Sequence, residues 1–185
     1  LMNRLFTLKL AFLKTDPDMI KSAINVFSKI IEVKPSLVIH SEIFTTTVIG
    51  FAIGGLEANE AFIIKSVLKF WCNILNMKRG SKEDQDRILQ LFCDQKLGKH
   101  VTFSLVTSFL KAPRSNLEYY YSVFRGLVGK FPIPFKEWFQ QTLREIPDII
   151  TPRMSEKDLD LFVHKLMITR GRRTANEVLK SLWLT

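Results

Sequence analysis

Apolar residues recur along the chain at helical intervals, and polar or helix-breaking residues separate the apolar stretches. The first complete stretch follows an acid-proline-acid sequence at 16–18, which is how many helices start. Apolar residues then recur every three or four positions from 20 to 31, and Pro35 ends the pattern. These features predict a helix over residues 17–33.

Further stretches with the same spacing predict helices along the rest of the chain. One of them begins with Ser81 and Asp84, which match the spacing of a capping box. Trp71 and Trp138 fall on the apolar faces of two others, so both are predicted to anchor the core. The predicted helices span residues 57–77, 81 to near 98, 99–110, 116–130, 134–144, 155–168 and 174–184.

The stretch over residues 36–54 has two interpretations. Its β-branched residues, which include the threonines at 45–47, favour a strand. Its apolar residues run together without alternation, however, and no partner strand is evident elsewhere, so the pattern favours a helix. The apolar run over 43–56 is shorter than the roughly 20 residues that cross a bilayer, which indicates a buried helix and no membrane span.

Eight or nine helices with short connections predict an all-α fold. Helix starts near Asp16 and Glu57 are about 41 residues apart, within the roughly 40–47 residue period of HEAT and armadillo helix pairs. The Gly50-x-x-x-Gly54-Gly55 spacing is expected to let a neighbouring backbone approach closely. We therefore expect one α-solenoid segment of HEAT-type antiparallel helix pairs over residues 1–185, with the helices of 155–185 capping it.

Composition indicates a folded chain from a reducing compartment. Hydrophobic residues make up 46% and charged residues 24% of the sequence, which excludes an intrinsically disordered segment. Cys72 and Cys93 lie in apolar helical patterns, so we expect buried thiols and no disulfide. The helical periodicity is already present at Leu5 and persists at Leu182, so the chain is expected to be a fragment of a longer protein.

Positive charge concentrates in the later part of the chain. The net charge is +9, with eight basic against six acidic residues up to Met77 and nineteen against twelve after it. A small basic cluster at 78–82 opens this later part. A solvated loop is the first interpretation of this cluster, and a weak anion site is the second.

A second basic cluster is the candidate binding site. Arg170, Arg172 and Arg173 gather between two predicted helices, and Arg153 and Lys157 precede them. Guanidinium groups offer planar forks of donors that suit phosphate or carboxylate, so these five residues are the candidate cargo-binding or anion-binding set. The alternative interpretation is a solvated loop between two helices.

The sequence contains no arrangement that indicates catalysis, a metal or a cofactor. His40, His100 and His164 are widely separated and belong to no HExxH or Cys-x-x-Cys array. Cys93 and His100 would share a face of one continuous helix, but two ligands do not make a zinc site. The glycines and lysine at 126–130 are too closely spaced for a phosphate loop. We therefore expect no catalytic residue, no metal and no cofactor, and a chain that is not an enzyme.

Two stretches of the chain resemble a known family. They are the aromatic-rich segment 119–132, continued by Trp138 and Phe139, and the arginine-rich segment 170–184. With these stretches, the chain resembles the C-terminal region of the importin-beta superfamily of nuclear import receptors over essentially all of its length. Within that superfamily it is similar to the transportin-SR and fungal mRNA transport regulator group.

This resemblance implies a part of a karyopherin, a non-catalytic receptor that shuttles between cytoplasm and nucleus. It implies a right-handed superhelix of HEAT pairs that helps to bind RNA-binding protein cargo rich in Arg/Ser or Arg/Gly sequences. It also implies nuclear pore proteins and the GTPase Ran as partners of the full-length receptor, with Ran-GTP controlling cargo release. Whole receptors of this kind are typically acidic, so a basic surface here would be a local feature.

A helical nucleic-acid-binding domain is the alternative function. The sequence pI is about 9.7, and an arginine cluster suits nucleic-acid phosphates. Aromatic residues such as Phe92 and Phe139 fall at core spacing, however, which leaves no evident platform for stacked bases. Direct nucleic-acid binding is therefore disfavoured. A third interpretation is the accessory domain of an enzyme whose chemistry lies elsewhere in its chain.

Overall fold

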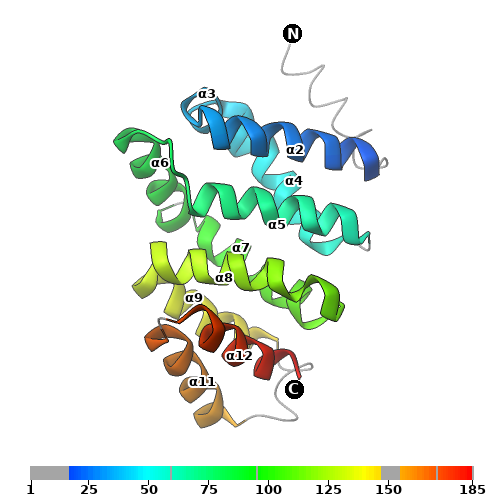
Figure 1. Cartoon of the computed structure of the whole chain (residues 1–185). Helices are drawn as coiled ribbons and strands as arrows, with labels where there is room; N and C mark the ends of the chain where they lie inside the picture. The colour runs from blue at the N-terminus through cyan, green and yellow to red at the C-terminus, as the bar shows by residue number, and fades with distance from the viewer. Residues whose placement is uncertain (1–16, 59, 95, 147–154, 170, 185) are drawn as a thin grey trace. The chain divides into compact units, whose positions relative to one another are not determined.

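A computed structural model of the chain describes residues 17–58, 60–94, 96–146, 155–169 and 171–184. These residues contain helices and no strand, which confirms the all-α prediction and excludes a strand over 36–54. No helix among them is both long enough and apolar enough to cross a bilayer. The chain divides into two compact units, Leu1–Asp84 and Gln85–Thr185, whose helices are labelled in Figure 1.

The first unit has two long helices that lie side by side. Its helices are α2 (Pro17–Val33), α3 (Ser36–Ile39), α4 (Ile49–Gly54) and α5 (Ala61–Leu75). The bounds of α2 are those predicted, because the acidic start and Pro35 mark its two ends. α2 packs along α5, and both helices contribute fully buried side chains, among them Ile24, Ile31, Val67 and Trp71.

The segment between α3 and α5 is helical, but it is not the single regular helix that we predicted. A π-helical turn, η1 (Phe44–Val48), precedes α4, and a 3-10 turn, η2 (Gly55–Glu57), follows it. The Thr45 and Thr46 hydroxyls donate to the Glu42 carbonyl at 3.0 and 2.8 Å. Such bonds from threonine to a preceding carbonyl often bend helices, and π-turns form where the α-helical ladder is disturbed.

The glycines of this segment do not act as their spacing suggested. A Cβ built on Gly50 or Gly54 would meet no neighbouring group within 4 Å, whereas one on Gly55 would lie 2.6 Å from Val67 Cγ2. The close approach is therefore between Gly55 and a side chain of α5. The expected backbone contact at the first two glycines was wrong.

The predicted capping box opens α6 (Lys82–Cys93). The Asp84 N–H donates to Ser81 Oγ at 3.2 Å, and the Ser81 N–H donates to the Asp84 carboxylate at 2.9 Å. This fully buried carboxylate also accepts the Ser36 hydroxyl at 2.7 Å and pairs with His40 Nε2 at 2.9 Å. Burial alone would raise the pKa of Asp84, but the hydrogen bonds from Ser36, Ser81 and His40 hold it below its ordinary value.

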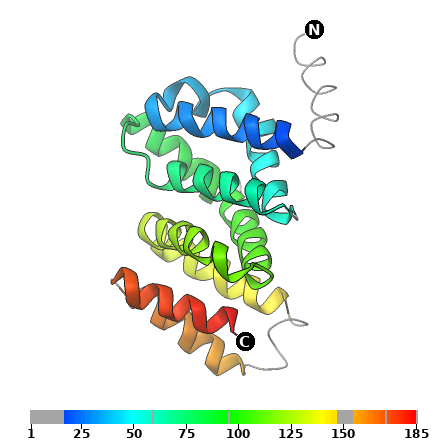
Figure 2. The ribbon, with the colours of Figure 1, turned by 45° about the vertical axis from the view of Figure 1, so that its right-hand side comes forward.

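The second unit is built around α9, which contacts α7, α8 and α11. Its helices are α7 (Leu97–Leu110), α8 (Leu117–Lys130), α9 (Pro132–Glu145), α11 (Glu156–Ile168) and α12 (Arg172–Trp183), with a 3-10 turn, η3 (Arg114–Asn116), before α8. Phe109, Phe124 and Phe139 form its aromatic centre, with neighbouring ring centroids 5.3 and 5.8 Å apart. Figures 1 and 2 show α11 and α12 side by side.

Specific hydrogen bonds hold the end of the α11–α12 pair at which α11 begins and α12 ends. Ser155 and Asp158 form a capping box at the start of α11, and the Ser155 hydrogen bonds hold the pKa of Asp158 below its ordinary value. The Trp183 indole N–H donates to the Ala112 carbonyl at 3.0 Å, which ties the end of α12 to the end of α7. The α12 helix begins at Arg172, two residues before the predicted start.

Two further predictions about packing need correction. Trp71 is fully buried, as predicted, but Trp138 is only half-buried; its ring lies against Gly98 and 5.9 Å from the Phe131 ring. Cys93 is exposed at the last position of α6, so it is not a buried thiol. Because α7 is a separate helix, Cys93 and His100 do not share one helical face.

Candidate anion-binding site

The five basic residues that the sequence singled out do not form one cluster. Arg153 and Arg170 lie outside the described residues. Lys157 lies in the first turn of α11, whereas Arg172 and Arg173 lie in the first turn of α12. The two helices pair in opposite directions, and α11 has 13 residues, a length of about 20 Å. Lys157 is therefore separated from the two arginines by the length of the helix pair.

Arg172 and Arg173 belong to a helix start and not to a loop. The N-terminal end of a helix carries a partial positive charge, so cations are disfavoured there and anions are favoured. The first turn of α12 contains no acidic residue, and its N-cap residue, Gly171, has no side chain that could cap the helix. Both arginines are exposed, and Arg173 has no hydrogen bond or ion pair with the described part of the chain. This helix start is therefore suited to an external anion.

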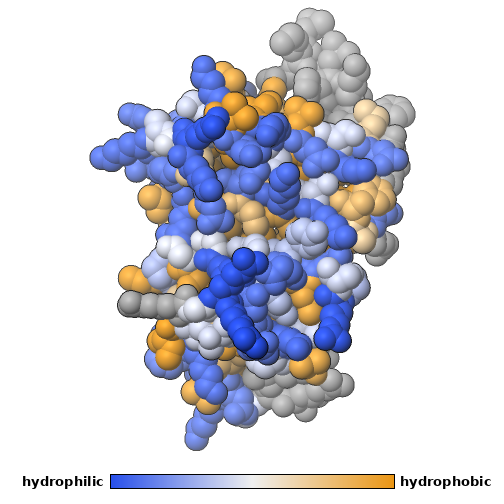
Figure 3. Space-filling model, viewed as in Figure 1, coloured by the Kyte–Doolittle hydropathy of each residue, from blue (hydrophilic) through white to orange (hydrophobic). Residues whose placement is uncertain are grey.

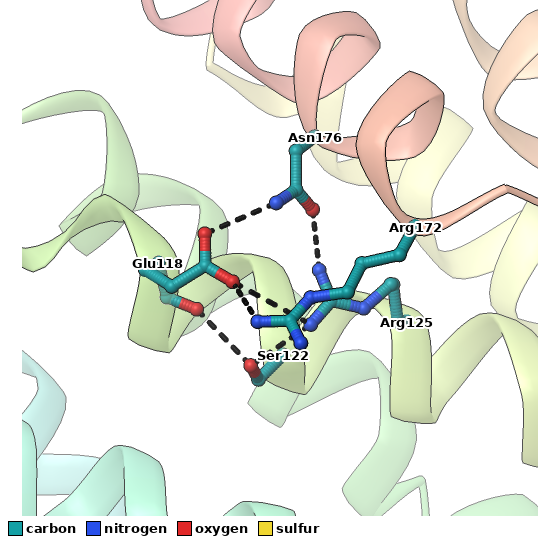
Figure 4. A network of polar contacts seen from close by, with 5 residues as sticks. All are labelled: Glu118, Ser122, Arg125, Arg172 and Asn176. Carbon is teal, nitrogen blue, oxygen red and sulfur yellow. Dashed lines mark hydrogen bonds and ion pairs between the residues drawn. The ribbon is translucent and has the colours of Figure 1, made fainter.

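A polar network links the start of α12 to α8, as Figure 4 shows. Arg172 Nη2 donates to Glu118 Oε1 at 2.6 Å, and Asn176 Nδ2 donates to Oε2 of the same carboxylate at 3.0 Å. Arg125 Nη2 lies 3.9 Å from Glu118 Oε1, and Arg125 Nη1 donates to Asn176 Oδ1. Ser122 Oγ accepts from Arg125 Nη2 at 3.0 Å and donates to the Glu118 carbonyl at 3.1 Å.

The network carries more positive than negative charge and is open to solvent. It contains two guanidinium groups and one carboxylate. The side chains of Arg125, Glu118 and Arg172 are 25%, 52% and 70% exposed. Figure 3 shows a mainly hydrophilic surface over α8 and α12. Exposed ion pairs of this kind are commonly worth about 1 kcal/mol or less, so an external anion can compete for these donors.

Two features lie next to this network. Burial raises the pKa of Tyr121, and the Glu118 and Glu177 carboxylates raise it further, so the phenol is neutral at physiological pH. A cavity of about 280 Å³ adjoins Arg125. The rest of its lining is mainly apolar and comes from α8, α12, α11 and the residue after α11: Val128, Gly129, Leu166, Met167, Thr169 and Ala175. Arg125 therefore borders both a polar network and an apolar cavity.

Sequence reasoning missed four members of the network: Glu118, Ser122, Arg125 and Asn176. On α8 the spacing of Glu118, Ser122 and Arg125 places them on one helical face, and Arg172 and Asn176 share a face of α12. This spacing is visible in the sequence. Which faces meet is not, because partners more than fifty residues apart are joined only by the packing of α12 on α8.

Comparisons with known proteins leave the site to be interpreted from its own geometry. No protein-family model matches the chain, and no curated protein matches its sequence. The resemblance to the importin-beta superfamily therefore stays a prediction from the sequence. Within the described residues, no three His, Cys, Asp or Glu side chains come together in a group that could hold a metal ion.

Proposed function

We propose that the chain is a segment of a nuclear import receptor, a helical protein-binding scaffold in which the start of α12 helps to hold an anionic segment of cargo. The observation that carries the proposal is the placement of Arg172 and Arg173. Both are exposed in a helical first turn, where their charge does not favour the helix itself. Arg172 pairs with Glu118, and Arg173 pairs with no group in the described part of the chain, so an external anionic partner is favoured beside them.

The arrangement of the helices supports a repeat scaffold. In the first unit α2 packs along α5, with the shorter α3 and α4 between them in the chain. In the second unit α11 and α12 form an antiparallel pair that packs on α9 and α8. Such helix pairs are the building blocks of HEAT-type α-solenoids. In a receptor of this type, Ran-GTP would control cargo release and other repeats would contact the pore.

The chemistry of the site favours a phosphorylated protein segment as the partner. RNA-binding cargo of this receptor class is expected to be rich in Arg/Ser sequences, whose serines become strong anions on phosphorylation. A phosphoserine carries a charge of roughly −1.5 to −2 and three acceptor oxygens, which pair well with guanidinium groups. Binding of single-stranded RNA usually relies on exposed aromatic platforms. Here Phe92, Phe139 and Trp71 are buried, whereas Phe62, Phe103 and Tyr119 are exposed, so the aromatic side chains do not decide between protein and RNA.

The proposal is tested by reversing the charges at the start of α12. Arg172→Glu combined with Arg173→Glu should weaken binding of a fluorescein-labelled, phosphorylated Arg/Ser-rich peptide by about tenfold at low salt, because attraction is replaced by repulsion. The loss should shrink as salt screens the charges. Fluorescence anisotropy measures the affinity, and thermal unfolding checks that the variant is folded.

Lys157→Glu is the matched control, because Lys157 is exposed in the first turn of the neighbouring helix but lies at the other end of the pair. We expect this variant to bind the peptide as the parent chain does. If the double arginine variant is folded and binds the phosphorylated peptide with parental affinity at low salt, the proposed function is wrong for this surface.

A further inference from the structure

The Glu118 carboxylate lies in a set of donors that resembles a binding site for an external anion. Arg172 and Asn176 donate to its two oxygens at 2.6 and 3.0 Å, and an Arg125 nitrogen lies 3.9 Å away. These donors come from two different helices, and they converge on one carboxylate in Figure 4. Guanidinium and amide donors converging in this way are what a phosphate or carboxylate of a ligand requires.

Glu118 is a replaceable occupant of this set of donors. Its side chain is 52% exposed and begins in the first turn of α8, so it can rotate into solvent without unpacking the helix. A phosphate group offers more charge and more acceptor oxygens than the carboxylate it would replace. Within the network Glu118 supplies one negative charge to two guanidinium groups, whereas a dianionic phosphate would supply two.

We propose that Arg125, Arg172 and Asn176 form a phosphate-binding site, and that Glu118 occupies it until the phosphoryl group of a partner peptide displaces it. The inference rests on the proposed function, because it assigns the anionic group of the cargo to specific donors. Arg173, exposed at the next position of α12, supplies a further cation for a second phosphate on the same peptide. Glu118 thereby acts as an internal competitor that weakens binding of peptides without phosphate.

The test removes the competitor and keeps the donors. Glu118→Gln should tighten binding of the labelled phosphorylated Arg/Ser-rich peptide by about three- to fivefold at low salt, the range that loss of one exposed ion pair allows. Glu145→Gln is the matched control. It makes the same change in net charge by breaking the Lys99–Glu145 pair between α7 and α9, and it should leave the affinity unchanged.

A second variant tests the donors themselves. Arg125→Gln should weaken binding of the same peptide severalfold, while thermal unfolding reports whether the unit stays folded. The inference is overturned if Glu118→Gln binds the phosphorylated peptide no better than the parent, or if Glu145→Gln improves binding equally. It is also overturned if Glu118→Gln improves binding of single-stranded RNA as much as that of the phosphorylated peptide, because the gain would then be unspecific.

The two proposals fail in different ways. If the Arg172 and Arg173 charge reversals abolish peptide binding while Glu118→Gln changes nothing, the start of α12 binds the anion but Glu118 does not compete for it. If the charge reversals change nothing, the proposed function itself is wrong.

Discussion

Replacing Trp71 with alanine is expected to lower the free energy of unfolding by about 3–5 kcal/mol. The indole is fully buried in the first unit and contacts Phe70 edge-on, with ring centroids 5.4 Å apart at 76°. Its Nε1–H also donates to the Ala52 carbonyl at 3.2 Å, so truncation leaves both a cavity and a buried carbonyl without that donor. Urea unfolding followed by circular dichroism measures the loss.

Two comparison variants make the Trp71 result specific. Trp71→Phe keeps most of the buried ring and loses the hydrogen bond, so it should cost clearly less than alanine. Trp138→Ala removes a ring of the same kind from a half-buried position, and it should also cost less. A Trp71→Ala variant with the same free energy of unfolding as the parent would contradict the packing described for the first unit.

Replacing Gly98 with alanine is expected to destabilise the second unit by at least about 1–3 kcal/mol. At most helical positions, replacing glycine with alanine stabilises the helix by about 1 kcal/mol. Here we expect the opposite effect on stability, because of local packing. A Cβ on Gly98 would lie 2.1 to 2.5 Å from three carbons of the Trp138 ring. The indole ring is rigid and has no flexible end that could rotate out of the way. Relieving the clash therefore requires α7 and α9 to move apart.

The control for this prediction is Gly129→Ala, since a Cβ there meets no neighbouring group within 4 Å. The position is exposed near the end of α8, so the substitution should leave the free energy of unfolding unchanged or raise it by up to about 1 kcal/mol. Adding Trp138→Leu to Gly98→Ala should restore part of the lost stability, which a double-mutant cycle quantifies. A Gly98→Ala variant as stable as the parent would show that the indole does not lie against α7.

The helices were predictable wherever apolar spacing and end signals agreed. The acidic start and Pro35 delimit α2, and the Ser81 capping box marks the start of α6. The segment between α3 and α5 was predicted less well. Helical spacing identified it as helical, but the threonine side-chain bonds to Glu42 and the resulting π-turn depend on local geometry that periodicity does not encode.

The candidate site was predictable only in part, because its parts come from separate helices. The arginine cluster identified Arg172 and Arg173, although both were placed in a loop and not in the first turn of α12. Glu118 and Arg125 carried no motif that would single them out. Their role depends on α12 packing against α8, and a single sequence does not reveal which helical faces meet.

The central claim is that the chain binds the phosphorylated form of a protein segment. The most direct measurement is the affinity of the chain for a phosphorylated Arg/Ser-rich peptide, its unphosphorylated twin and a single-stranded RNA of matched length, over a series of salt concentrations. The phosphorylated peptide is expected to bind at least about tenfold more tightly than its twin, and more tightly than the RNA at physiological salt. Equal affinity for the two peptides, or RNA that binds more tightly with an affinity falling steeply with salt, would contradict the central claim.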